Sequence, residues 1–187
     1  MSSRCPFVLV TGNASKVIEA RRILGLELDS VEVDLPEIQS LDQREILAAK
    51  GEEAWRQLGR PLVVEETGFE LDAMAGFPGP LVKWMLAAIG PEGIARCALA
   101  LGNPVARARC QVLYRDSSRT IVGEGVDEGR LVLPPRGDAG FGWDPVFVPE
   151  GKVETWAELG PGPKDELGHR GRAWRDLRRC LRDRGLW

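Results

Sequence analysis

The sequence predicts an α/β fold with a mixed β-sheet flanked by helices. Apolar runs that resemble strands alternate with helical stretches over the first 64 residues, a pattern typical of parallel βα units. Two long segments of alternating polarity, 106–114 and 119–132, then follow one another directly and predict an antiparallel pair in the same sheet. The 187 residues fit a single domain, which we expect to span residues 1–187.

The elements of the N-terminal third follow from apolar periodicity and from the residues that interrupt it. Thr11-Gly12-Asn13 ends the first apolar run, Pro36 ends the second strand, and Gly59-Arg60-Pro61 stops the second helix. In chain order we expect a strand at 7–10, a helix at 15–24, a strand at 30–35, a helix at 41–58, and a strand at 62–64 that runs into Glu65 and Glu66.

Glycine and proline divide the rest of the chain. Gly76-Phe77-Pro78-Gly79-Pro80 predicts a bend, and Gly123, Gly125 and Gly129 predict bends within the second long strand. After the first bend we expect helices at 82–89 and 92–101, strands at 106–114 and 119–132, a loop at 134–142, a strand at 146–148 and a last helix at 172–182.

Composition excludes several classes of protein. Apolar residues make up 43% and charged residues 28% of the chain, which is ordinary for a globular domain and excludes a disordered or collagen-like chain. No apolar stretch approaches the ~20 residues that a membrane span needs. Residues 1–6 lack the apolar core of a signal peptide, so we expect a cytoplasmic protein without a membrane partner.

The four cysteines predict neither a zinc site nor a disulfide framework. Cys5, Cys97, Cys110 and Cys180 contain no Cys-x-x-Cys pair, and a single histidine accompanies them. A chain of this size does not need disulfides for stability, so we expect buried structural thiols.

Charge is unevenly distributed along the chain, although the formal net charge is only −3. Residues 164–187 carry eight basic and four acidic side chains, and the remainder carries 17 basic and 24 acidic ones. A basic C-terminal segment permits the hypothesis of a DNA-binding protein, whose affinity would depend strongly on salt. The acidic body argues against this hypothesis, and we expect no nucleic-acid partner.

A first candidate site lies at Thr11-Gly12-Asn13-Ala14-Ser15-Lys16, between an apolar strand and the start of a helix. Backbone N–H groups and the helix dipole at such a turn favour an anion, and Lys16 adds a cation. The segment matches neither a P-loop nor a dinucleotide-binding glycine fingerprint. It indicates either a phosphate site or a plain βα turn that Asn13 caps.

Carboxylates form a second candidate site. Glu65 and Glu66 follow an apolar strand and precede Thr67-Gly68, and strand ends in α/β sheets commonly carry sites. Mg²⁺ prefers oxygen ligands and often takes one or two carboxylates together with substrate phosphates. Glu45 on the expected second helix is a further candidate ligand. The alternative is an ordinary exposed pair of acids.

An aromatic loop, Gly140-Phe141-Gly142-Trp143-Asp144-Pro145, forms a third candidate site. Two bulky rings flank a glycine, and an acid and a proline follow them. Such a loop either stacks a ring on a nucleobase or forms a packed aromatic corner.

Lys164 and the pair His169-Arg170 form a fourth candidate site just before the last helix. A lone histidine is more often structural than catalytic. The charge of Arg170 disfavours the charged form of His169, and a neutral imidazole can donate to or accept from a purine edge.

Taken together and in order, these segments resemble the inosine triphosphate pyrophosphatase (Ham1) family over about residues 7–177. The resemblance implies an elongated α/β fold of two lobes, with the substrate in the cleft between them, usually as a homodimer. It implies a metal-dependent hydrolase, with Mg²⁺ expected and Mn²⁺ as an alternative. Such enzymes cleave noncanonical purine nucleoside triphosphates (ITP, dITP, XTP) to the monophosphate and pyrophosphate. The segments that carry the resemblance are Thr11-Gly12-Asn13-Ala14-Ser15-Lys16, Leu35-Pro36-Glu37-Ile38-Gln39, Val64-Glu65-Glu66-Thr67-Gly68, Gly76-Phe77-Pro78-Gly79-Pro80-Leu81-Val82-Lys83-Trp84, Phe141-Gly142-Trp143-Asp144-Pro145-Val146-Phe147 and His169-Arg170-Gly171-Arg172-Ala173.

The resemblance also implies roles for individual residues. Glu66, Lys16 and Lys50 would be catalytic, and Glu45 and Glu66 would hold the metal, unless Glu66 instead orients the attacking water. Substrate contacts would come from Thr11, Gly12, Asn13, Lys16 and Lys50 at the triphosphate, from Thr67 and Gly68, from Phe141, Gly142, Trp143 and Asp144 around the base and sugar, and from Lys164, His169 and Arg170 at the purine 6-oxo edge.

Two positions depart from the family pattern. Glu66 stands where Asp is usual, which moves the carboxylate by about one methylene, and Gly168 stands where Ser usually precedes His-Arg. Two alternatives therefore stay open: a Maf-like pyrophosphatase of pyrimidine or modified nucleotides, and a nucleotide-binding module without turnover. The Phe-Gly-Trp-Asp-Pro and His-Arg segments count against the first.

Overall fold

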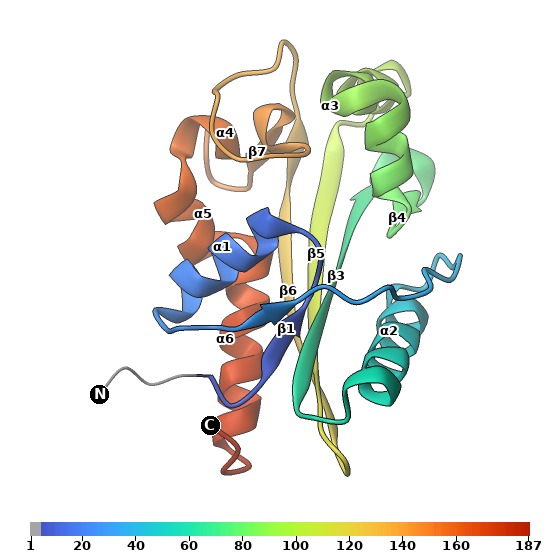
Figure 1. Cartoon of the computed structure of the whole chain (residues 1–187). Helices are drawn as coiled ribbons and strands as arrows, with labels where there is room; N and C mark the ends of the chain where they lie inside the picture. Colours follow the sequence, from blue (N-terminus) through green and yellow to red (C-terminus); the bar gives the residue numbers. More distant parts are fainter. Residues whose placement is uncertain (1–4) are drawn as a thin grey trace.

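The sheet is mixed, as the sequence predicts, and has seven strands within residues 5–187, which the computed structural model describes (Figure 1). β1 (Val8–Val10) is parallel to both β2 (Ser30–Val31) and β3 (Leu62–Leu71), and the remaining pairs are antiparallel. The other strands are β4 (Pro78–Gly79), β5 (Val105–Arg115), β6 (Thr120–Leu131) and β7 (Phe147–Pro149). The strand order is β2-β1-β3-β5-β6-β7, and β4 pairs with β3 outside this path.

Helices cover both faces of this sheet (Figure 1). α6 (His169–Arg182) packs on β5 and β6 with α1 (Ala14–Leu24) beside it. α2 (Gln43–Leu58) packs on the opposite face. Each of these helix-covered faces has its own apolar core, and a third core lies at the far ends of β3 and β5. The third core joins these strand ends to η1 (Asp72–Met74), α3 (Val82–Ala100), η2 (Asp144–Val146) and α4 (Trp156–Leu159). α5 (Pro161–Leu167) follows and leads into α6.

The two edges of β3 are occupied differently. β5 pairs with β3 from Leu62 to Leu71, so any other neighbouring strand must lie on the opposite edge. On that edge, β1 pairs with the first two residues and β4 pairs with Phe69 and Glu70. Among the described strands, none pairs with residues 64–68 on that edge, and the sheet is open there to groups from helices and loops.

Several elements differ in extent from the expectation. The strand expected at 62–64 continues to Leu71, because the long β5 pairs with it past the polar residues Glu65 and Glu66. The helices expected at 82–89 and 92–101 are one element, α3, kinked at Gly90, whose φ of 67° interrupts the helix. The last helix begins at His169, earlier than expected.

Three further segments show where local pattern misleads. The strand expected at 30–35 shrinks to β2, and residues 32–39 run on without regular structure. Periodicity does not indicate α4, although Thr155 and Glu158 form a capping box at its start. It does not indicate α5 either, a short helix that begins with Pro161.

All four cysteine thiols are free. Cys5 and Cys110 are buried as expected, whereas Cys97 in α3 and Cys180 in α6 are partly exposed. The expectation of buried thiols is wrong for these two, because each lies near the margin of a helix face that solvent reaches. Within residues 5–187, we find no helix with the length and apolar character needed to cross a membrane.

Candidate active site

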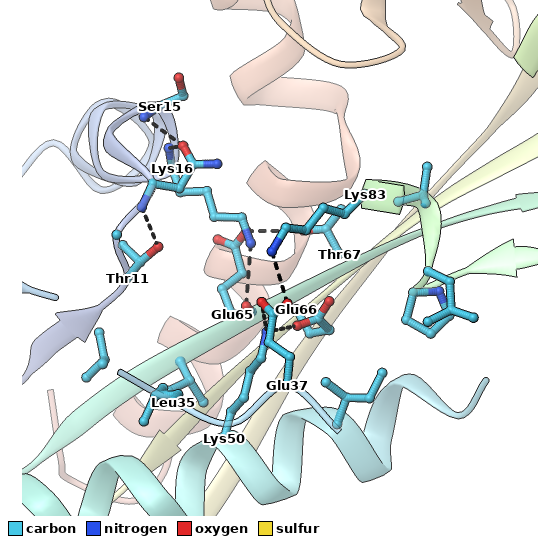
Figure 2. Close-up of a pocket in the computed structure, with 18 of the residues that line it drawn as sticks. Thr11, Ser15, Lys16, Leu35, Glu37, Lys50, Glu65, Glu66, Thr67 and Lys83 are labelled. Atoms are coloured by element: carbon cyan, nitrogen blue, oxygen red, sulfur yellow. Dashed lines mark hydrogen bonds and ion pairs between the residues drawn. The ribbon is translucent and has the colours of Figure 1, made fainter. Parts of the chain in front are cut away.

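An open cleft of about 1520 Å³ lies over the unpaired interval of β3 (Figure 2). The β1–α1 turn, the segment 32–39, α2, the start of α3, the aromatic loop and α6 all contribute to its walls. Of the site residues expected from the sequence, it is lined by Thr11, Gly12, Asn13, Lys16, Lys50, Glu66, Thr67, Phe141, Trp143 and Arg170, and not by Glu45, Gly68, Gly142, Asp144, Lys164 or His169.

The β1–α1 turn is a capped helix start. The side-chain oxygen of Asn13 accepts hydrogen bonds from the N–H groups of Ser15 and Lys16 at 3.0 and 3.3 Å, and Thr11 Oγ1 accepts one from the Asn13 N–H at 3.1 Å. Asn13 thus satisfies two N–H groups that lack a carbonyl partner within the helix. The turn also lines the cleft, so capping and phosphate binding are compatible, and phosphate binding stays a prediction.

Glu65 and Glu66 point to opposite faces of the sheet, because side chains alternate along a strand. Glu65 faces α6, where its Oε1 accepts hydrogen bonds from Arg170 Nε at 2.9 Å and from Thr67 Oγ1 at 3.2 Å. Glu66 faces α2, where its Oε2 lies 2.6 Å from Lys50 Nζ. The two adjacent acids therefore belong to two different charge clusters.

Glu65 is a buried, ionised carboxylate. Burial alone would raise its pKa, but the charges of Arg170 and Lys16 outweigh burial and lower the pKa to about 2. Lys16 Nζ lies 3.4 Å from Glu65 Oε1, and Arg170 also contacts the buried Glu19 of α1. Because both partners come from other elements, Glu65 joins α1 and α6 to the middle of β3.

Glu66 belongs to a second cluster, on the α2 side of the cleft (Figure 2). Lys50 Nζ, 2.6 Å from Glu66 Oε2, is also 3.5 Å from Glu37 Oε1, and Lys83 Nζ is 3.0 Å from Glu37 Oε2. The hydrogen bond from Lys83 outweighs burial and lowers the pKa of Glu37. Burial, the largest single influence, lowers the pKa of Lys50, but the charges of Glu66 and Glu37 and the hydrogen bonds to them together outweigh it, and the net change is upward. Glu37 and Lys50 are therefore both charged at neutral pH.

Glu45 lies outside this cluster. It is exposed on the first turn of α2, and its Oε2 accepts a hydrogen bond from Ser40 Oγ at 2.7 Å. Glu37, not Glu45, shares Lys50 with Glu66 inside the cleft. In the part of the chain that the structure describes, no group of three or more His, Cys, Asp or Glu side chains could hold a metal ion by itself.

Lys164 is a buried ammonium behind the aromatic loop. Its Nζ lies 2.6 Å from Asp144 Oδ2 and 3.3 Å from Glu19 Oε1. The same Asp144 oxygen accepts a hydrogen bond from the Phe141 N–H at 2.8 Å, and Lys164 Nζ is 4.7 Å from the centre of the Phe141 ring. Lys164 and Asp144 thereby fix the ring of Phe141 in the cleft wall.

Trp143 and His169 lie next to each other in the same region. Trp143 stacks on Phe69 with ring centres 4.5 Å apart, and its ring is 6.0 Å from that of His169. Burial, together with the charge of Arg170, lowers the pKa of His169 well below its ordinary value, which confirms the expected neutral imidazole. Within residues 5–187, Trp143 Nε1 and His169 Nδ1 are buried and have no hydrogen-bond partner.

The sequence profile of the Ham1 family matches residues 7–180. The chain belongs to the Ham1 family. A dITP/XTP pyrophosphatase of Methanopyrus kandleri is 38% identical to it over 170 residues, and the match covers 89% of this chain and 90% of that protein. An inosine triphosphate pyrophosphatase of Puccinia graminis f. sp. tritici is 36% identical over 182 residues, and the match covers 91% of this chain and 94% of that protein.

Solved Ham1 structures share the fold. A HAM1 protein from Coxiella burnetii has a TM-score of 0.82 at 26% identity, covering 96% of this chain and 99% of that one. A nucleoside-triphosphatase (dITP/XTP pyrophosphatase) from Mycobacterium abscessus has a TM-score of 0.67 at 28% identity, covering 94% and 98%. These likenesses confirm the resemblance and the mixed α/β fold that the sequence predicts.

Two acids that contact the expected residues of this Ham1 site are absent from the site expected from the sequence: Glu37, which lines the cleft, and Glu19, which does not. The sequence contains an indication that Glu37 belongs to the site, because Glu37 lies in the Leu35-Pro36-Glu37-Ile38-Gln39 segment of the resemblance. The indication for Glu19 is weaker: Glu19 follows Lys16 by three residues and so lies on the same helix face as Lys16. Its partners Lys164 and Arg170 come from elements about 150 residues away.

Proposed function

We propose that this Ham1 protein hydrolyses noncanonical purine nucleoside triphosphates, such as ITP, dITP and XTP, to the monophosphate and pyrophosphate. The observation that carries the proposal is that one cleft combines two chemistries. The ammonium groups of Lys16, Lys50 and Lys83 suit a polyphosphate, and the aromatic side chains of Phe141 and Trp143 suit a base. The names of the Methanopyrus and Puccinia relatives agree with this substrate class.

The donor set of the cleft fits a hard divalent cation. The carboxylates of Glu37 and Glu66 approach the same ammonium group, that of Lys50, and both residues line the cleft. Two carboxylates completed by phosphate oxygens of a substrate are a ligand set that Mg²⁺ prefers. Glu37 would hold Mg²⁺, with Mn²⁺ as an alternative, and Glu66 would be a second ligand unless it only orients the attacking water. The position of Glu37 in the cleft favours it over the exposed Glu45 as a ligand. When bound, such a cation neutralises charge on phosphate oxygens.

The residues of the chain have distinct tasks in this reaction. Glu66 orients a water molecule and accepts its proton as the water oxygen bonds to the α-phosphorus. The bond from the α-phosphorus to the oxygen bridging to the β-phosphorus breaks, and its electron pair leaves with pyrophosphate. Lys16 and Lys50 stabilise the negative charge of the leaving group. The turn at 11–13 and the pair Thr67-Gly68 hold the triphosphate in line.

Base selection is assigned to the aromatic loop and to Lys164, His169 and Arg170, which we propose face the 6-oxo edge of the purine. Trp143 lines the cleft, and its unmatched Nε1 supports a polar ligand beside it. His169, whose Nδ1 is also unmatched, does not line the cleft in this structure. A site built to hydrogen-bond an oxo group leaves its own groups unpaired against ATP, which carries an amino group there. Such polar mismatches reject a substrate strongly.

Product analysis tests the function. The chain is incubated with Mg²⁺ and, separately, with ITP, XTP, dITP, GTP, ATP and dTTP, and pyrophosphate is distinguished from orthophosphate. We expect monophosphate and pyrophosphate from ITP, XTP and dITP, with ATP and GTP nearly untouched. Hydrolysis of dTTP above all others would support the Maf-like alternative. Binding of ITP without hydrolysis of any of the six would support a nucleotide-binding module.

The same proposal includes a homodimer that acts on the cytoplasmic nucleotide pool. Phe77, Trp84 and Ile89, around β4 and α3, are exposed by 41%, 60% and 44%, and exposed apolar side chains of this size support a protein interface. Analytical sedimentation of the chain and of a Trp84→Glu variant measures the oligomeric state. A monomeric wild-type chain at micromolar concentration would contradict the dimer.

A further inference from the structure

Gln43 is a buried polar side chain in the first turn of α2. It is 7% exposed, and a buried amide requires hydrogen-bond partners. Its Nε2 donates to the backbone carbonyl of Glu66 at 2.9 Å and to that of Arg109 at 3.4 Å. Both partners are carbonyl oxygens, which only accept, so the amide nitrogen must face them. Gln43 therefore bridges β3 and β5 at the level of Glu66.

Gln43 and Lys50 contact the same residue from the same helix. They are seven residues apart, which is two turns of α2 and one helix face. Gln43 contacts the main-chain carbonyl of Glu66, and Lys50 contacts its carboxylate at 2.6 Å. The main chain and the side chain of Glu66 are thus both fixed to α2.

Gly68 leaves the space that Gln43 occupies. A Cβ atom at position 68 would lie 2.8 Å from Gln43 Oε1, closer than real Cβ contacts come. Gly68 does not have a positive φ, so backbone conformation does not require glycine there. Its missing side chain instead leaves room for the amide of Gln43 over the strand pair.

We propose that Gln43 is a positioning residue for the hydrolysis, acting through Glu66. The inference rests on the proposed function, in which Glu66 orients the attacking water. Residues 64–68 of β3 have a neighbouring strand on one edge only, β5, and the Gln43 amide bonds across this β3–β5 pair, so it adds a restraint to the main chain of Glu66. Displacing a catalytic carboxylate by a fraction of an ångström lowers kcat without removing the groups that bind substrate.

Gln43→Met removes the amide and keeps the length of the side chain. With ITP and Mg²⁺, we expect kcat to fall about 10- to 100-fold while KM changes less than about threefold. Gln57→Met is the matched control, because Gln57 lies on the same helix and its Nε2 also donates to a backbone carbonyl, that of Asp34 at 3.1 Å. The control should stay within about twofold of wild type in kcat. Equal losses in both variants would overturn the proposal.

A double-mutant cycle separates positioning from general destabilisation. Glu66→Asp shortens the carboxylate and keeps its charge, so its own loss reflects misplacement. If Gln43 acts through Glu66, the combined variant loses less than the product of the two single losses. A multiplicative result would overturn the positioning role. Gln43→Asn, which keeps the amide but shortens its reach, should also lower kcat, and it replaces Gln43→Met if thermal melting shows that variant unfolded.

Failure of the proposed function has a different signature. If the wild-type chain does not hydrolyse ITP, or Glu66→Gln retains turnover, the role of Glu66 itself is wrong. If Glu66→Gln is inactive and Gln43→Met matches the Gln57→Met control, only the role of Gln43 is wrong.

Discussion

Glu65 and Glu66 are adjacent in the chain, yet Glu65 contacts Arg170 of α6 and Glu66 contacts Lys50 of α2. The alternation of β3 sends one carboxylate to each face of the sheet. Both residues line the cleft, but the side chain of Glu65 is 1% exposed and bonded to the buried Arg170, whereas that of Glu66 is 11% exposed and shares Lys50 with Glu37. One dipeptide therefore supplies a structural counter-charge and a group that can act on substrate.

Glu65→Gln and Glu66→Gln should consequently fail in different ways. Glu65→Gln leaves the buried Arg170 and Lys16 without one negative partner, and removal of one member of a buried ion pair costs about 3 kcal/mol of unfolding free energy or more. Glu66→Gln leaves Lys50 with its second partner, Glu37, so it should cost less unfolding free energy than Glu65→Gln, and it should abolish turnover with ITP still bound. Urea unfolding and ITP titration measure both. Unchanged turnover in Glu66→Gln would remove the role assigned to Glu66.

Acid should destabilise the fold through Glu65. Its pKa is about 2 in the folded chain against an ordinary value of 4.5, so the folded state favours the ionised form. The stabilisation is fully present above about pH 4.5 and is lost as the pH falls towards 2, by about 3 kcal/mol in total. Unfolding free energy measured between pH 5 and pH 2.5 should fall less steeply in Glu65→Gln. Parallel curves for the variant and the wild type would contradict this assignment.

Asp127 should have the opposite effect on the pH dependence of stability: it should destabilise the fold as the pH rises. It is buried on β6, where its Oδ2 accepts a hydrogen bond from Trp156 Nε1 at 2.6 Å, and burial raises its pKa to about 6. The folded state favours the protonated form, so stability is lost as the pH rises from about 4 through 6. Asp127→Asn keeps an oxygen for Trp156 and should raise the unfolding free energy at pH 7.5 by about 1–3 kcal/mol, with little effect at pH 4.

Asp116→Asn is the control for this prediction. The backbone N–H of Ser118 and further hydrogen bonds outweigh burial and lower the pKa of Asp116, so its charge is favourable in the folded state. Asp116→Asn should therefore not stabilise the chain at pH 7.5. Equal stabilisation by both variants would attribute the effect to net charge rather than to the burial of Asp127.

The sequence predicts the β1–α1 turn well because its signals are local: an apolar run, a capping Asn13 and a lysine one turn later. It predicts β3 poorly, because the strand continues through Glu65 and Glu66 only by pairing with β5, which lies some 40 residues further along the chain. For a related reason, the sequence points to Glu45 and not to Glu37 as a candidate metal ligand. Helical periodicity places Glu45, whereas Glu37 lies in an irregular segment whose path depends on Lys50 and Lys83.

Gly168 is the last position at which the structure makes a sharp prediction. The sequence departs here from a serine usual in the family, and the lost hydroxyl suggests weaker purine discrimination. The structure adds a steric reason for glycine: a Cβ atom at position 168 would lie 2.7 Å from the Lys164 carbonyl oxygen, at the close junction of α5 and α6. The Lys164 carbonyl oxygen already accepts a hydrogen bond from the Gly168 N–H at 2.9 Å, so neither the carbonyl group nor the main chain of Gly168 can move freely.

Gly168→Ser should therefore destabilise the chain by about 1–3 kcal/mol, as overpacking does, and should not improve the preference for ITP over ATP. Because Lys164 and His169 flank the junction, its displacement would disturb the contacts of Lys164 with Asp144 and Glu19. Thermal melting and the ratio of kcat/KM for ITP and ATP measure the two effects. Gly162→Ser in α5, where a Cβ meets open space, is the matched control and should change neither. A stable Gly168→Ser variant with sharper discrimination would show that the missing hydroxyl, and not the close junction, governs this position.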